Sequence, residues 1–165
     1  MTLDEERLVE ILSEHLDESG HLTFRELTIT RNLLDMAALS DTAVQKRIDL
    51  AGLNKYDGQI CFFEAEREFT VKHPLTYRSF CDFCYLLAPA TTYRELPEAI
   101  REEQVEWAAK EGLGIVLIEE DGRIHLVTSA KRNILSREVR TAVRSIMRTQ
   151  DPLSSLYPQI PPFAQ

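Results

Sequence analysis

The stretch from residue 46 to residue 68, KRIDLAGLNKYDGQICFFEAERE, constrains the fold more than any other part of the sequence. Residues 47–53 and 59–66 are rich in β-branched, aromatic and other apolar side chains. Asn54 to Gly58, between them, contains the Asn and the Asp-Gly pair that favour a tight turn. The pattern predicts a β-hairpin, and it therefore sets which side chains of the two strands face each other.

The remaining sequence places helices and further strands around this hairpin. The expected elements are a helix over 4–17, a strand over 21–30, one or two short helices over 31–45, a buried strand over 79–89, a helix from Pro97 to Gly112, a hairpin over 113–127 and a helix over 136–148. This order predicts an α/β domain with a central mixed β-sheet flanked by helices. We expect residues 1–150 to form a single domain and the proline-rich residues 151–165 to form a C-terminal tail.

Three acidic residues interrupt the apolar pattern of the hairpin. Asp49 lies in the first strand, and Glu64 and Glu66 end the second. Alternate residues of a strand face the same side, so Glu64 and Glu66 point together and the pairing brings Asp49 near them. Carboxylates gathered on one face repel each other unless a cation neutralises them, and Mg²⁺ is commonly held by one or two carboxylates and water. The alternative is that these acids form the solvated face of an edge strand.

The motif R-I-D, followed after 14 residues by E-A-E and then R-E-F, resembles the core motif of the PD-(D/E)-X-K nuclease-like superfamily. The downstream stretches YRSFCDFCYLLAP and EEQVEWAAKEGLGIVLIEEDGRIHLV are also similar to segments of that superfamily, so the resemblance covers roughly residues 4–130. It implies a restriction-endonuclease-like core and a nuclease that hydrolyses phosphodiester bonds in DNA, of a repair or restriction type.

The resemblance also implies roles for individual residues. Asp49 and Glu64 would bind Mg²⁺ or Mn²⁺, and Glu66 stands where the family usually has Lys and would position or deprotonate the attacking water. Glu10, or Glu14, would be the auxiliary acid of the first helix. Lys72, or Lys46, would supply the missing positive charge, and His73 lies closest in sequence to the acidic motif. With Glu66 in place of Lys, a catalytically inactive scaffold with the same fold remains an alternative.

The charge distribution bears on a DNA partner. The chain has a net charge of −8, but residues 1–20 carry a net −6 and residues 131–150 a net +5. The predicted last helix places arginines at steps of three, four and four residues. Arg148 is the last arginine of this face. The candidate phosphate contacts are Lys131, Arg132, Arg137, Arg140 and Arg144. The alternative is a solvated basic face.

A second interpretation of the N-terminal half is a helix-turn-helix DNA-binding regulator that uses residues 26–53. Its second helix would begin at Ser40 and carry Lys46 and Arg47. The two interpretations differ in one respect: residues 47–52 are a strand in the nuclease-like fold and a helix in the regulator.

The other sequence signals are weaker. Cys81 and Cys84 have the C-x-x-C spacing of zinc and redox sites, but nothing nearby completes a tetrahedral site, so we expect small buried residues. No apolar run reaches the roughly 20 residues that span a bilayer. The first residues are acidic rather than basic, unlike a secretory leader. These features predict a cytoplasmic protein without a membrane partner, and a homodimer stays open.

Overall fold

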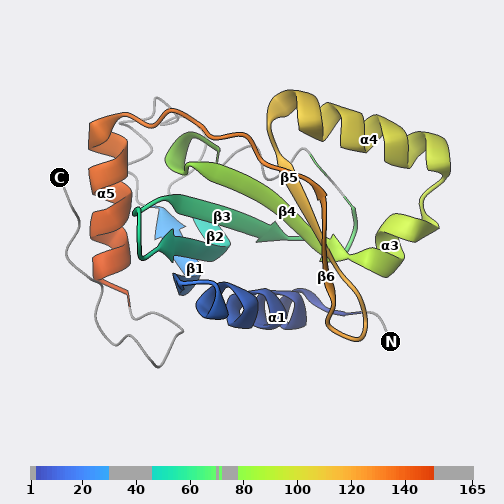
Figure 1. Ribbon diagram of the computed structural model, residues 1–165, viewed down its shortest axis with the longest axis horizontal. Coiled ribbons are helices and arrows are strands. Elements are labelled where there is room, and N and C mark those ends of the chain that lie inside the picture. The colour runs from blue at the N-terminus through green and yellow to red at the C-terminus, as the bar shows by residue number, and fades with distance from the viewer. Residues whose placement is uncertain (1–2, 30–45, 70, 72–77, 151–165) are drawn as a thin grey trace.

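The computed structural model describes residues 3–29, 46–69, 71 and 78–150. Figure 1 shows a central β-sheet with helices on both sides. Within the described residues the sheet has six strands. The strands lie in the sheet in chain order: β1 (His21–Ile29), β2 (Lys46–Asn54), β3 (Ile60–Ala65), β4 (Phe83–Pro89), β5 (Gly114–Ile118) and β6 (Ile124–Thr128). Strand β2 is antiparallel to both neighbours, β3, β4 and β5 run parallel, and β6 is antiparallel to β5. The chain is therefore an α/β protein with a central mixed sheet flanked by helices.

The helices of the described residues divide between the two faces of the sheet. Helix α1 (Glu5–Glu18) buries its apolar stripe in one core, with side chains from β2, β3, β4 and β5. On the other face, α4 (Glu98–Glu111) contributes Ala108, and α5 (Arg137–Arg148) contributes Val139, Val143 and Met147 to a second core. Helix α3 (Ala90–Glu95) follows β4 directly. Both faces of β3 are buried, as expected for a strand in the middle of a layered domain, whereas Phe83 and Tyr85 of β4 are half-buried.

Local signals predict most of these elements correctly. Asp4 caps α1 by accepting a hydrogen bond from the Arg7 N–H at 2.8 Å, and Ser136 caps α5 by accepting one from Val139. Gly112 ends α4 in the left-handed conformation, at φ +79°. The predicted hairpins over 47–66 and 113–127 are both present. In the described ranges, no helix has the length and apolar character needed to span a membrane.

Other predictions need correction or lie outside the described residues. Residues 46–54 form a strand, so the helical interpretation of 47–52, on which the helix-turn-helix alternative over 26–53 depends, is wrong. Strand β4 starts at Phe83 instead of residue 79, because residues 78–80 form a 3₁₀ turn. The short helix α3 was not anticipated. The segment 31–45, the tail 151–165, Lys72 and His73 lie outside the described residues.

In β1 and β2 the alternation of side chains between the two faces of the sheet is interrupted at one position of the ladder. Phe24 and Leu27 lie in the same core although they are three residues apart, so the alternation of β1 is interrupted between them, where Glu26 has a positive φ of 55°. On β2, Ile48 and Leu50 lie in opposite cores although they are two residues apart. The ladder pairs residues 25 with 50 and 27 with 48, so Asp49 lies opposite Glu26. Because of this irregularity, the Asp49 side chain does not follow the regular alternation of side chains between the two faces of the sheet.

Candidate functional site

Asp49 and Glu64 meet where the β2–β3 ladder ends. The last pair of that ladder is Leu50 with Phe63, and the next two residues outward are Asp49 and Glu64. Beyond this pair the hydrogen bond between the two strands is made by a side chain instead of the main chain: Asp49 Oδ2 accepts a hydrogen bond from the Ala65 N–H at 2.8 Å. The Glu64 carboxyl is hydrogen-bonded to that of Asp49. The structure thus brings together the two residues that the hairpin pairing predicts as neighbours.

Glu64 is a buried carboxyl group. The residue is only 6% exposed. Its Oε2 has no hydrogen-bond partner in the part of the chain that the structure describes. Burial, followed by the hydrogen bond and the charge of Asp49 and the charge of Glu66, raises the pKa of Glu64 to about 10. At neutral pH Glu64 therefore keeps its proton and donates it to the Asp49 carboxylate. A neutral acid and a carboxylate share the site.

Helix α1 supplies an acid to this cluster, but not the predicted one. Glu10 is exposed and forms an ion pair with Arg7 at 3.1 Å. Glu5 lies here instead: desolvation and then the charges of Asp49 and Glu66 raise its pKa, and its carboxylate accepts a hydrogen bond from the Arg67 N–H. Five residues separate the two positions, which is about 7.5 Å along a helix. Glu5, in the first turn after the N-cap, carries no motif that would single it out in the sequence.

Glu66 and Arg67 lie near the pair, and a further buried acid, Glu119, lies at the same edge of the sheet. Glu66 is half-buried just beyond β3, where its N–H donates to the Leu87 carbonyl at 2.9 Å. Arg67 follows it, and its positive charge acts on Glu5. At the same carboxyl-end edge of the sheet, Glu119 after β5 is buried and paired with Arg94 and, at 3.2 Å, with His125. Sequence analysis did not single out Arg67 or Glu119.

The donor set fits a small, hard cation. Carboxylate oxygens are the ligands that Mg²⁺ and Mn²⁺ prefer, and Glu64 Oε2 is a buried oxygen without a partner among the described residues. Two carboxylates are enough, since Mg²⁺ usually keeps several waters. Within residues 3–29, 46–69, 71 and 78–150, no three His, Cys, Asp or Glu side chains come together as a metal site. A cation here would be held by Asp49 and Glu64 and complete its shell with water or substrate.

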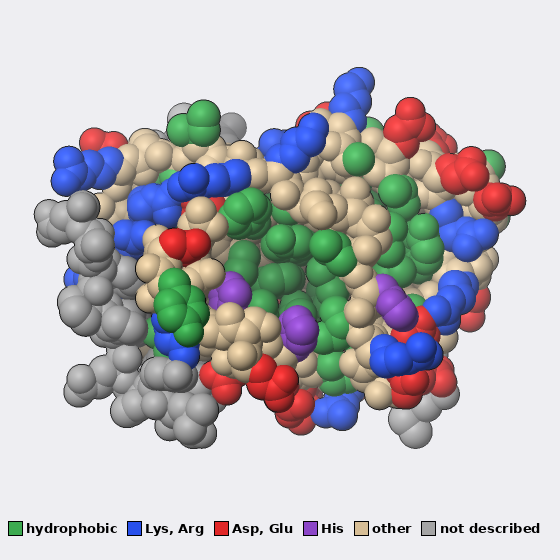
Figure 2. Space-filling view, viewed as in Figure 1, with side chains coloured by type: hydrophobic (Ala, Val, Ile, Leu, Met, Phe, Trp, Pro, Cys, Tyr) green, Lys and Arg blue, Asp and Glu red, His purple; other side chains and the backbone are tan. Residues whose placement is uncertain are grey.

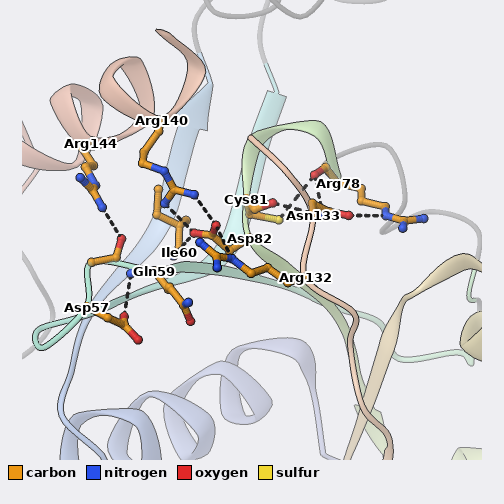
Figure 3. Close-up of polar contacts among 11 residues, drawn as sticks. Asp57, Gln59, Ile60, Arg78, Cys81, Asp82, Arg132, Asn133, Arg140 and Arg144 are labelled. Atoms are coloured by element: carbon orange, nitrogen blue, oxygen red, sulfur yellow. Dashed lines mark hydrogen bonds and ion pairs between the residues drawn. The ribbon is translucent and has the colours of Figure 1, made fainter. Parts of the chain in front are cut away.

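Figure 3 shows that two of the predicted phosphate contacts are occupied within the protein. Asp82 is fully buried directly before β4. Its carboxylate accepts hydrogen bonds from both terminal nitrogens of the Arg140 guanidinium and, at 2.7 Å, from the Ile60 N–H. Burial alone would raise the pKa of Asp82, but the hydrogen bonds and charge of Arg140 hold it below its ordinary value. Arg144 donates to the Gly58 carbonyl at 2.7 Å. Arg140 and Arg144 therefore anchor α5 to the β2–β3 turn and β4.

The other basic candidates remain at the surface. Lys131, Arg132 and Arg137 are exposed, although Arg132 lies 3.6 Å from Asp82. The four arginines of α5 are therefore not one free basic face. A spacing of three and four residues is expected both for arginines that anchor a helix and for arginines that bind phosphate. For Arg140, the ion pair with buried Asp82 shows the anchoring role.

The three cysteines lie in the protein interior as free thiols. Burial, followed by the hydrogen bond with Cys84, raises the pKa of Cys81, and burial raises that of Cys61 to about 12. Thiols with a raised pKa are poor nucleophiles. The expectation of small buried residues is met in the structure.

The mixed sheet with helices on both faces and a carboxyl pair at the end of a ladder defines the class of the protein as α/β, with a candidate acidic site. No protein-family model matches the chain, and no curated protein matches it either. Among solved structures, a protein of unknown function from Silicibacter pomeroyi has a similar fold, with a TM-score of 0.61 and 17% sequence identity. The match covers 90% of this chain and 87% of that chain. At this identity the likeness concerns the fold alone.

Proposed function

We propose that this protein binds Mg²⁺ or Mn²⁺ at the Asp49–Glu64 pair and acts on DNA as a phosphodiesterase of the PD-(D/E)-X-K nuclease-like type. One observation carries the proposal: a buried glutamic acid lies against an aspartate from the neighbouring strand, and one of its oxygens has no hydrogen-bond partner among the described residues. The sequence resemblance assigns metal binding to the same two residues. When bound, the cation would supply a stabilising positive charge for a phosphodiester displacement.

The residues of this chain have defined tasks in the proposal. The Ala65 N–H holds the Asp49 carboxylate in place. The neighbouring Glu64 loses its proton when a cation binds, and the cation takes the place of that proton between the two carboxylates. Glu66, half-buried beside the pair, positions water, and Arg67 offsets part of the negative charge. Exposed Lys131, Arg132 and Arg137 contact DNA phosphates.

The spacing of these groups limits how DNA can bind. Arg140 and Asp82 lie beside Ile60 at the start of β3, whereas Glu64 lies four residues further along the strand, about 13 Å away. A DNA backbone that touches both the carboxyl pair and the basic surface near α5 must therefore follow the direction of β3.

Calorimetric titration with Mn²⁺ at pH 7 tests the cation site. We expect binding in the wild type with release of about one proton, since Glu64 is protonated beforehand, and this release is measured by repeating the titration in buffers of different ionisation enthalpy. Glu64→Gln should lose the binding and the proton release. Glu10→Gln, on the exposed side of α1, is the matched control and should bind as the wild type does. Mn²⁺ binding that survives Glu64→Gln, or no binding in the wild type, would refute the site.

Cleavage of plasmid and single-stranded DNA with Mn²⁺ tests the reaction separately. Wild-type cleavage that is lost in Asp49→Asn supports the enzyme. Glu66 in place of the family's Lys favours the second candidate, an inactive scaffold with the nuclease fold. That candidate predicts Mn²⁺ binding lost in Glu64→Gln, together with DNA binding but no cleavage.

A further inference from the structure

The segment between β6 and α5, residues 129–136, carries a fully exposed isoleucine. Among the described residues, Ile134 is the most exposed large apolar side chain. Lys131 and Arg132 before it and Arg137 after it are exposed as well, and they are the phosphate contacts of the proposed function. In Figure 1 this segment runs from β6 toward the upper left, to the start of α5, and Figure 2 shows Lys and Arg side chains gathered in the same region. An apolar side chain thus lies within a basic stretch of the chain.

The segment is held firmly on both sides of Ile134. The Asn133 N–H donates to the Asp82 carbonyl at 2.7 Å. The Asn133 side chain donates to two main-chain carbonyls of the turn before β4, and its Oδ1 accepts a hydrogen bond from Arg78 Nε at 2.7 Å (Figure 3). On the other side, Leu135 packs against the core beneath α5. Because both neighbours of Ile134 are fixed, little main-chain freedom is lost when a partner covers this side chain.

A cavity of about 520 Å³ lies beside Ile134. Its volume falls within the range of roughly 300–1,000 Å³ that is usual for sites of small ligands. The wall combines the apolar side chains of Ile134 and Leu135 with the polar side chains of Arg78, Ser79 and Glu111. A nucleobase has the matching character, since its two faces are apolar and its edge carries hydrogen-bonding groups.

The polar groups of the cavity suit the edge of a base. Arg78 uses its Nε to hold Asn133, but among the described residues its two terminal nitrogens donate no hydrogen bond. One of these nitrogens lies 4.0 Å from the Glu111 carboxylate, which is longer than a hydrogen bond. The cavity therefore offers both N–H donors and a carboxylate acceptor, and the edge of a base presents acceptors and donors in turn.

We propose that Ile134 enters a DNA duplex as a wedge and that the cavity beside it receives the nucleotide displaced from the stack. This proposal rests on the proposed function, because Lys131, Arg132 and Arg137 bind the DNA backbone on either side of the wedge. Isoleucine is one of the side chains that insert between base steps from the minor groove and unstack them. Displacement costs least for a base that is mispaired or unpaired, so the site selects duplex DNA that contains such a base.

The fluorescence of 2-aminopurine measures the displacement, because stacking within a duplex quenches this base. The full chain is added, in EDTA, to a short duplex with one mispaired 2-aminopurine, and we expect the wild type to raise the fluorescence several-fold at saturation. Ile134→Ala should lose most of this rise. Leu126→Ala shortens an exposed aliphatic side chain of β6 and is the matched control, which should behave as the wild type does. Anisotropy of an end-labelled strand shows that the DNA is saturated, which the phosphate contacts allow for each variant.

A second variant tests the cavity. Ser79 is exposed at the cavity wall, so Ser79→Trp fills the space and should also lose the rise in fluorescence. Circular dichroism confirms that each variant is folded. A rise that survives either Ile134→Ala or Ser79→Trp, or a wild type that binds DNA without any rise, overturns this proposal and leaves the proposed function standing. A wild type that binds no DNA overturns both. Because EDTA removes the cation, failure of the Asp49–Glu64 site alone would leave these results unchanged.

Discussion

Replacing Glu64 by Gln should make the fold more stable at neutral pH. In the unfolded chain this carboxyl ionises near its ordinary pKa of 4.5, whereas in the folded protein the pKa of Glu64 is raised to about 10. Between these two pH values the folded state binds one proton more than the unfolded state. The free energy of unfolding therefore falls as the pH rises from 4.5 toward 10, and the stability that the protonated Glu64 contributes is complete only below pH 4.5.

The size of the effect follows from the raised pKa. Each pH unit in that range costs about 1.4 kcal/mol, so the wild type has lost about 3 kcal/mol at pH 7 relative to acid conditions. Gln keeps the shape of a protonated Glu, has no proton to lose, and can donate an N–H to Asp49 as Glu64 donates its proton. Glu64→Gln should match the wild type near pH 4 and exceed its stability by about 3 kcal/mol at pH 7.

Urea unfolding at pH 4, 5.5, 7 and 8, in the presence of EDTA, measures the difference. The half-buried Trp107 provides a fluorescence signal, and circular dichroism provides a second probe. Glu10→Gln, on the exposed side of α1, is the control and should show no growing difference from the wild type. A difference between Glu64→Gln and wild type that stays constant from pH 4 to pH 8 would refute the reasoning, because it would mean that Glu64 ionises alike in both states.

Three further outcomes concern the packing around the site. Arg140→Met removes the partner of the fully buried Asp82 and should cost about 3–5 kcal/mol in the free energy of unfolding, measured by urea denaturation; a cost below 1 kcal/mol would contradict the buried pairing. Gly114→Ala places a methyl group against the Tyr85 ring and 2.9 Å from the Ala130 amide nitrogen, so it should lower stability by about 1–3 kcal/mol, seen as a lower melting temperature. Ser136→Ala removes the N-cap of α5 and should cost about 1 kcal/mol, while Ser136→Asp should retain it.

The candidate site divides into a part that was predictable and a part that was not. Asp49 and Glu64 become neighbours because a hairpin with a short turn fixes its own register, and both the turn and the strands have local signals. Glu5 replaces Glu10 because the angle at which α1 crosses the sheet, and not any local pattern, decides which acid reaches the end of β3.

The roles of the arginines depended even more on distant residues. The spacing of Arg140 and Arg144 indicates one helix face, but Asp82 and Gly58, which hold them, lie 58 and 86 residues away in sequence. Nothing near the helix in sequence indicates that a carboxylate is buried beneath it.

The sequence by itself determined most of the secondary structure and the mixed α/β class, because caps, turns and apolar periodicity act within a few residues. It left residues 47–52 open between strand and helix, and it did not indicate α3. It also determined the charge polarity between the first and the last described helix. Only the tertiary structure decided that Glu64 is buried and neutral and that α5 is anchored through Arg140. These properties depend on which surfaces lose their water when the layers pack, and that depends on contacts between residues far apart in the chain.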